Sequence, residues 1–296
     1  GVVIKIMLLM TEKTLDCCDP IDSRQFIIAI KKLADDIGYG SDRSTFLGSG
    51  IEYVQSRAYQ IGDPIKSIDW KVTGRTGKFH VKEYEAPKQM PIYLLIDTSA
   101  SMTVSSVEIS KYHSAVRIAG GIAFAGLDRI SPVGVVGTGG RELFVKPTLS
   151  KYRILQWLLK LRSYRLNEPT LIGTRLSELM PILNSRSMIV LISDLHDCSA
   201  MPALKLASQK HDCVVLKLTD PVETEIHGAG FVKVREAETG STGIINKKSK
   251  NTDSALITEE LKRSGIDCLQ LLTDKPIAHK LRQFFKSRAL LSRGTR

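Results

Sequence analysis

Cysteine is scarce in this chain, and its spacing limits what the protein can be. The five cysteines are odd in number, and none belongs to a CxxC pair. Cys17 and Cys18 are adjacent, which makes them poor disulfide partners. These features exclude a small disulfide framework, so we expect reduced thiols, mostly as core residues, and a cytoplasmic location.

Long apolar runs are also lacking. No run approaches the roughly 18–20 residues that a membrane helix needs, so we expect no membrane span. Residues 1–10 are apolar, but Lys5 interrupts them and no small-residue cleavage site follows, which argues against a signal peptide. A translated stretch before a start at Met7 or Met10 is at least as good an interpretation, and residues 1–20 are predicted to be a flexible segment.

Two sequence motifs of common enzyme and nucleotide-binding classes are absent. Ser99 does not lie in a GxSxG turn, which argues against a serine hydrolase. The glycines of residues 137–140 have no phosphate-loop lysine and serine after them, so nucleotide binding is unsupported.

Acidic residues are missing from residues 146–165, although the whole chain has a formal charge of +11. Such a basic face can attract an acidic protein, nucleic acid or anionic lipid, and a solvated helix surface is an equally good interpretation. Without interleaved stacking aromatics or a recognised motif, nucleic acid is the weakest of these hypotheses. The candidate partner-binding residues are Lys146, Lys151, Arg153, Arg162 and Arg165.

The pattern of apolar residues predicts an α/β fold over residues 91–291. Residues 92–96 and 187–192 are apolar runs that are each followed closely by an acid, as in strands buried on both faces. They alternate with helical patterns, which predicts a doubly wound, mostly parallel sheet with helices on both faces. A β-rich insertion is expected near residues 226–250.

Residues 21–90 are predicted to form a helix followed by a small β-rich extension. Apolar residues recur at helical spacing over residues 22–38, whereas residues 51–84 read as short extended segments separated by turns. We expect Tyr59, Trp70 and Tyr84 to pack this extension against the main sheet, with a recognition surface as the alternative.

Two carboxylates are expected at one edge of the sheet. Ligands collect at the carboxyl ends of parallel strands, which places Asp97 and Asp194 on one rim. Two ionised carboxylates ~5 Å apart at an effective dielectric of ~20 repel by about 3 kcal/mol, and a cation between them removes that penalty. Ser99, Ser101 and the loop residue Thr170 add hydroxyls, and oxygen ligands of this kind favour Mg²⁺, or Mn²⁺ in its place.

The order of these elements resembles a known metal site. A DxSxS loop, a loop threonine and an aspartate after a later strand are similar to the metal-ion-dependent adhesion site (MIDAS) of von Willebrand A domains. The resemblance implies that a carboxylate from a partner completes the metal coordination. The metal ligands that it implies are Asp97, Ser99, Ser101, Thr170 and Asp194.

A second resemblance extends over about residues 41–290. The segment Arg57-Ala-Tyr-Gln-Ile-Gly-Asp-Pro-Ile-Lys-Ser-Ile-Asp-Trp70 is similar to the defining motif of the domain-of-unknown-function 58 family, and residues 232–240 resemble its carboxyl half. Ala58 replaces the family's usual acid, which puts a salt bridge there in doubt. Lys66 replaces the family's usual arginine, so the charge is kept but the bidentate hydrogen bonding of a guanidinium group is lost. The resemblance implies an adaptor or co-chaperone for a MoxR-type AAA+ ATPase.

We therefore expect a binding module and not an enzyme. The alternative is a metal-dependent hydrolase that uses the same ion to activate water. It would need a general base, for which His196 and Asp197 are the nearby candidates.

Overall fold

A six-stranded sheet forms the centre of the protein. The computed structural model describes residues 22–38, 52–85, 90–140, 143–163, 168–197, 199–225, 231–235, 242–246 and 256–294. The strands are β3 (Ile92–Ile96), β4 (Val133–Gly137), β5 (Phe144–Thr148), β6 (Met188–Ser193), β7 (Asp212–Thr219) and β10 (Asp267–Leu272). Their order is β10-β7-β6-β3-β4-β5, and only the β4–β5 pair is antiparallel. The predicted mostly parallel sheet is confirmed.

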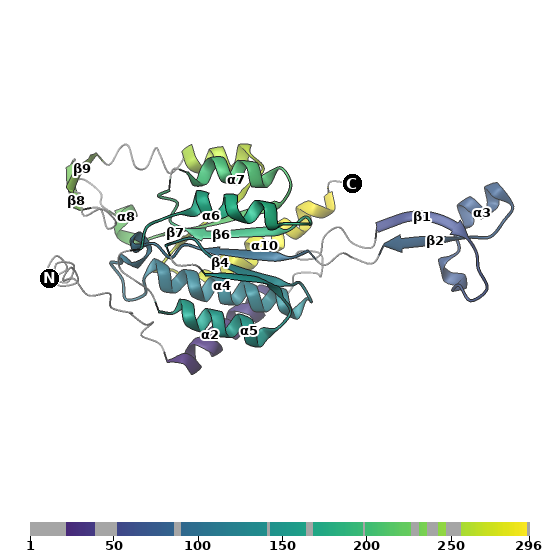
Figure 1. Cartoon of the computed structure of the whole chain (residues 1–296), viewed down its shortest axis with the longest axis horizontal. Helices are drawn as coiled ribbons and strands as arrows, with labels where there is room; N and C mark the ends of the chain where they lie inside the picture. The colour runs from purple at the N-terminus through teal and green to yellow at the C-terminus, as the bar shows by residue number, and fades with distance from the viewer. Residues whose placement is uncertain are drawn as a thin grey trace.

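Helices cover both faces of this sheet (Figure 1). Side chains alternate along β3, so that Ile92, Leu94 and Ile96 enter one core and Tyr93 and Leu95 the other. The first core is covered by α2 (Ser23–Gly38), α4 (Lys111–Asp128), α5 (Lys151–Leu161) and α10 (Ile277–Gly294). The second is covered by α6 (Ile172–Leu179), α7 (Ala200–Ser208) and a helix over residues 256–263. This arrangement agrees with a doubly wound fold.

The amino-terminal helix α2 packs against α4 in the first core. A Cβ at Gly120 would lie 2.7 Å from Ile30 Cδ1, and one at Gly121 would lie 2.6 Å from Leu33 Cγ. Only glycine at these two positions allows the helices to approach this closely. The domain boundaries inferred from the sequence stay a prediction, but α2 shares its core with the sheet.

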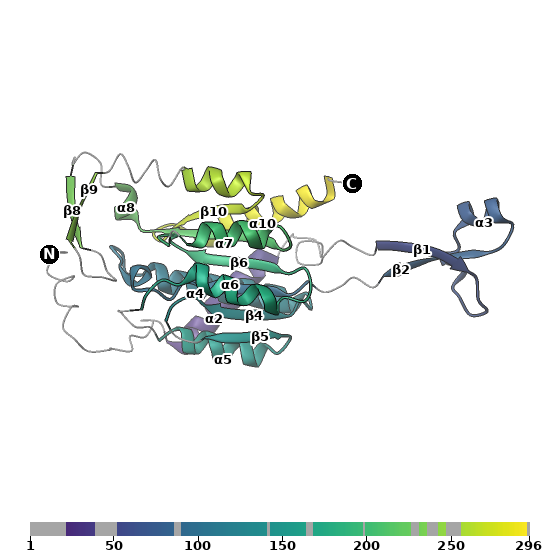
Figure 2. The same ribbon diagram turned by 45° about the horizontal axis from the view of Figure 1, so that its top comes forward.

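An antiparallel hairpin projects from the body. It consists of β1 (Glu52–Ala58), η2 (Ile65–Ser67), α3 (Trp70–Thr76) and β2 (His80–Glu85), which together are called the arm. In both ribbon views the arm lies at the opposite end of the body from α8 (Pro221–Glu225) (Figures 1 and 2). Since α8 follows β7, the arm extends from the edge where the parallel strands begin.

The arm differs from the prediction in two respects. Residues 70–76 form a helix where extended chain was expected, because the Asp69 carboxylate accepts bonds from the Lys71 and Val72 amides. Gly77 ends the helix in the left-handed conformation, with φ 69°. Trp70 is 65% exposed, so the expectation that it packs against the main sheet is wrong.

The remaining elements are short. They are η3 (Ala100–Thr103), η4 (Met180–Ile182), β8 (Phe231–Arg235) and β9 (Thr242–Asn246). The last two strands pair antiparallel within the region where a β-rich insertion was expected. Among the described helices, none has the length and apolarity that crossing a membrane requires. Residues 1–20 lie outside the described part of the chain.

Candidate functional site

Asp97 is held at the carboxyl end of the sheet by its neighbours on β3 and β6. Its backbone N–H donates to the Ile192 carbonyl at 3.0 Å, which continues the parallel ladder by one residue. Its side chain is fully buried, where Oδ2 accepts from the Ser193 hydroxyl at 2.6 Å and Oδ1 from the Ser99 amide at 3.0 Å. The carboxylate therefore has a fixed orientation. The carboxyl edge of the sheet, where Asp97 and Asp194 lie, is called the rim.

The two rim carboxylates affect each other. Burial, and then the negative charge of Asp194, raise the pKa of Asp97 to about 6, although bonds from Ser193 and Ser99 oppose the rise. Burial also opposes ionisation of Asp194, but the bond from His196 and the charge of Lys111 hold its pKa well below its ordinary value. Asp194 is therefore the permanently ionised member of the pair, and Asp97 titrates near neutrality.

A sharp turn follows Asp194. Leu195 has φ 59°, which is unusual for a residue with a bulky side chain, and its amide donates to the Ser193 hydroxyl at 2.9 Å. The turn brings His196 back, so that its Nδ1 lies 3.0 Å from Asp194 Oδ2. The His196 imidazole is half exposed, so it is the part of the rim that faces solvent.

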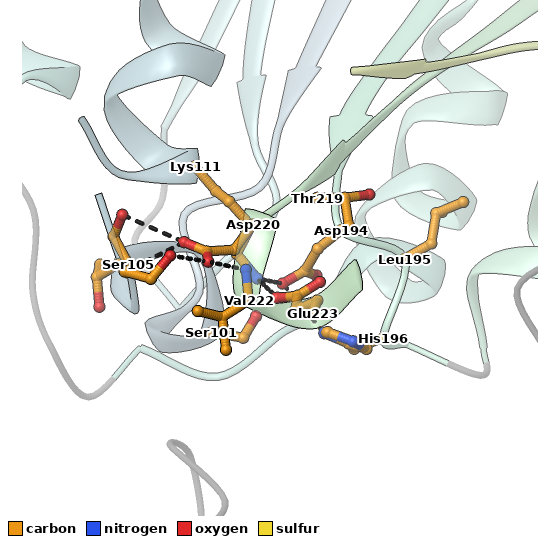
Figure 3. A network of polar contacts seen from close by, with 12 residues as sticks. Ser101, Ser105, Lys111, Asp194, Leu195, His196, Thr219, Asp220, Val222 and Glu223 are labelled. Carbon is orange, nitrogen blue, oxygen red and sulfur yellow. Dashed lines mark hydrogen bonds and ion pairs between the residues drawn. The ribbon is translucent and has the colours of Figure 1, made fainter. Parts of the chain in front are cut away.

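A buried lysine contacts Asp194 from the start of α4. Lys111 Nζ donates to Asp194 Oδ2 at 2.8 Å and to Glu223 Oε1, on α8, at 2.7 Å (Figure 3). Burial lowers the pKa of Lys111, but the charges of Asp194 and Glu223 outweigh it and raise the pKa overall. The ammonium group thus stays protonated and links the rim to α8.

Asp220 attaches α8 to the loop before α4. Its Oδ2 accepts from the Ser106 amide at 2.8 Å, and its Oδ1 accepts from the Ser106 hydroxyl and from the Val222 amide. Figure 3 shows Asp220 and Val222 beside the Lys111–Glu223 pair. The segment after β7 therefore lies across the rim and is fixed there at two points.

The predicted hydroxyl ligands lie in two adjoining loops. The Ser99 and Ser101 hydroxyls are 3.1 Å apart. The Ala100 amide donates to the Glu168 carbonyl, and the Leu171 amide donates to the Thr138 carbonyl, both at 2.9 Å. The backbone around half-buried Thr170 therefore lies against the loop that follows Asp97. Coordination of a metal by Thr170 stays a prediction.

The chemistry of the rim fits a hard cation. Asp194 Oδ1 is buried and has no hydrogen-bond partner among the described residues. The carboxylates of Asp194 and Glu223 are both bonded to Lys111, and the negative charge of Asp194 acts on Asp97. Within the described ranges no group of three or more His, Cys, Asp or Glu residues could hold a metal ion.

The basic face predicted from residues 146–165 is only partly available. Lys146 and Arg153 are exposed, and Lys151 pairs with Asp128 at 2.5 Å. Arg162 is buried, donates to the Ser23 hydroxyl at 2.9 Å and lies over the Phe26 ring. Arg165 lies outside the described residues. Binding of a partner by this face stays a prediction.

Sequence reasoning missed Lys111, Asp220 and Glu223. Asp220 directly follows a buried strand, so the rule that singled out Asp97 and Asp194 applies to it as well. Lys111 opens a helix, where a lysine is ordinarily a solvated side chain, and nothing in the sequence distinguishes it. Glu223 contributes only because the chain after β7 folds back across the rim.

Comparison with known proteins places the chain in a group that lacks a described activity. A family described as "Protein of unknown function DUF58" matches residues 55–264, which is most of the chain. An uncharacterized protein of Mycobacterium tuberculosis (strain H37Rv) is 24% identical over 279 residues, which cover 90% of this chain and 88% of the relative. An uncharacterized protein of Mycobacterium bovis matches to the same extent.

Proposed function

The chain belongs to the DUF58 family, and we propose that it is a metal-dependent protein-interaction module of the von Willebrand A type. One Mg²⁺ ion, or Mn²⁺ in its place, would be held at the rim and would bind an acidic side chain of a partner protein. The ligands would be Asp97, Ser99, Ser101, Thr170 and Asp194.

The observation that carries this proposal is the buried Asp194 Oδ1. This oxygen belongs to an ionised carboxylate and has no hydrogen-bond partner among the described residues. A buried charged oxygen without a partner is costly, and a hard cation satisfies it. The nearby Asp97, whose pKa is raised to about 6, would be held ionised by the same cation.

The proposed partner is acidic and is a MoxR-type AAA+ ATPase. The ATPase is what the resemblance to the DUF58 family implies. One feature of the chain supports an acidic contact: Glu223, an internal carboxylate, already lies beside the rim. Contact of the exposed Lys146 and Arg153 with the partner stays a prediction. The buried Cys213 and half-buried Cys268 are free thiols, which agrees with action in the cytoplasm.

Titration calorimetry with Mg²⁺ tests the metal site. We expect a saturable heat for the wild type that disappears in Asp97→Ala and weakens in Ser99→Ala, which changes packing very little. Asp128→Ala is the matched control, because it removes an exposed carboxylate outside the rim. Equal heats for the wild type and Asp97→Ala would contradict the proposal.

Binding to a purified MoxR-type ATPase tests the partner. Such ATPases need Mg²⁺ for their own nucleotide, so the rim must be disabled by substitution and not by a chelator. We expect Asp97→Ala to lose binding and Asp128→Ala to keep it. A complex that forms equally well with Asp97→Ala would exclude the rim as the contact.

The second candidate function is a metal-dependent hydrolase, for which the His196–Asp194 contact is the supporting observation. A carboxylate-bound imidazole can act as a general base. Asp197 is less suitable, since its oxygens accept from Gly173 and from Ser199. Mg²⁺-dependent cleavage of simple phosphoesters that vanishes in His196→Ala would favour this function over binding.

A further inference from the structure

The end of the arm, residues 59–80, exposes large apolar side chains to solvent. Ile61 is fully exposed, and Ile65, Trp70 and Phe79 are each more than half exposed. The arm has little core of its own: only Val81 is a buried apolar side chain among its described residues. Exposed apolar groups gathered at one place mark an interaction site, because burying them elsewhere releases water.

The loop that carries Ile61 is rigidly built. Arg57 donates from both terminal nitrogens to the Asp63 carboxylate, with each distance 2.7 Å. Asp63 also accepts from the Gln60 amide at 2.9 Å, and Gly62 supplies the positive φ of 109° that the turn requires. Because the turn is fixed in advance, little conformational entropy is lost when Ile61 becomes buried.

The same region is strongly cationic. Four exposed basic side chains carry no ion pair with any other described residue: Lys66, Lys71, Arg75 and Lys78. The acids of this region are already in use, since Asp63 bonds Arg57, and Asp69 is buried and caps α3. The end of the arm therefore lacks an anionic counterpart, and a second copy of it would be repelled.

Basic and apolar residues are direct neighbours along the chain in this region. Lys66 follows Ile65, Lys71 follows Trp70, and Phe79 follows Lys78. A protein interface ordinarily has an apolar centre depleted in charge. At a lipid headgroup layer, by contrast, each apolar side chain can enter the acyl boundary while its neighbouring lysine reaches a phosphate.

We propose that the end of the arm docks on an anionic phospholipid surface. Base stacking explains the aromatic rings but not the exposed Ile61 and Ile65, which argues against single-stranded nucleic acid. The arm extends beyond the body along the longest axis of the molecule, so its end reaches a flat surface without obstruction (Figures 1 and 2). Binding at this surface does not depend on the metal site at the opposite end of the sheet.

Fluorescence of Trp70 with lipid vesicles tests this proposal on the full chain. The chain has two tryptophans, so Trp157→Phe leaves Trp70 as the single probe. With vesicles of equal parts phosphatidylglycerol and phosphatidylcholine, we expect a shift of emission to shorter wavelength and co-sedimentation of the protein. Pure phosphatidylcholine is expected to give neither, and salt should weaken the effect.

Two matched pairs of variants locate the contact. Ile61→Asn should weaken vesicle binding by about tenfold, whereas Ile28→Asn, at an exposed site on α2, should not. Lys71→Glu with Lys78→Glu should weaken binding more than Lys31→Glu with Lys286→Glu, which makes the same charge change on the body. All these sites are exposed, so the variants should fold.

Several results would overturn the proposal. The first is unchanged Trp70 emission with anionic vesicles. The second is equal loss of binding in the arm and body variants, which would assign the effect to general positive charge. A larger emission shift with oligothymidylate or polyglutamate than with vesicles would instead identify nucleic acid or an acidic polypeptide as the occupant.

Discussion

The rim of the sheet and the end of the arm both concentrate charged side chains, but they hold them differently. At the rim, Asp97, Asp194 and Lys111 are buried and bonded to one another or to nearby hydroxyls and amides. At the end of the arm, Lys71 and Lys78 are exposed, and apolar side chains lie beside them in solvent.

This difference shows how each region is expected to select what it binds. Charges in a poorly solvated place must be compensated within a short distance, so the rim admits only a ligand that fits its fixed oxygens. Charges in water are screened and mobile, so the arm can meet any anionic surface that also buries its apolar groups. Substitutions at the rim should therefore affect stability as well as binding, whereas substitutions at the end of the arm should affect association alone.

The largest expected effect is the loss of the buried ammonium. Lys111→Met leaves Asp194 and Glu223 facing each other, which should cost about 3–5 kcal/mol of unfolding free energy. Denaturant unfolding in chelator measures it, and added Mg²⁺ should restore more stability to the variant than to the wild type. Lys151→Met, which breaks an exposed pair, should cost less than about 1 kcal/mol. If the two variants were equally stable, the rim would not behave as a buried network.

A smaller effect is expected from pH. The pKa of Asp97 is raised to about 6 from 3.8, so the folded state binds its proton more tightly than the unfolded state. Stability in chelator should therefore rise as pH falls from about 7 to about 4, by up to about 3 kcal/mol relative to Asp97→Asn. Asp194, whose pKa is lowered, loses its contribution only below that window. Parallel stability curves for the two proteins between these pH values would refute the assignment.

The smallest expected effects come from glycines in the two regions. A Cβ at Gly173 would lie 2.6 Å from the Ser199 backbone oxygen, so Gly173→Ala should cost about 1–3 kcal/mol. Gly74 lies within α3 with nothing within 4 Å of its Cβ position, so Gly74→Ala should stabilise that helix by about 0.5–1 kcal/mol. Thermal unfolding measures the first, and hydrogen exchange of α3 amides measures the second. If both substitutions changed stability in the same direction, the contrast between a packed rim and an open arm would not hold.

The sheet and its helices were predictable from the sequence because burial on both faces leaves a continuous apolar run. Residues 92–96 and 187–192 carry that pattern, and the acids that follow them had to lie at the carboxyl edge of a parallel sheet. The arm was predicted less well. Short segments such as α3 depend on single capping contacts, and the exposure of Trp70 depends on whether anything packs against it.

By itself the sequence determined the sheet, the position of Asp97 and Asp194 and the positive charge of the chain. Tertiary structure alone decided that Lys111 and Glu223 join the rim, that Arg162 is buried, and that the end of the arm stays in solvent. The physical reason is the range of the forces involved. Burial repeats regularly along neighbouring residues and therefore leaves a pattern of apolar residues in the sequence. The pairing of charges that are far apart in the chain is set only when distant segments pack together.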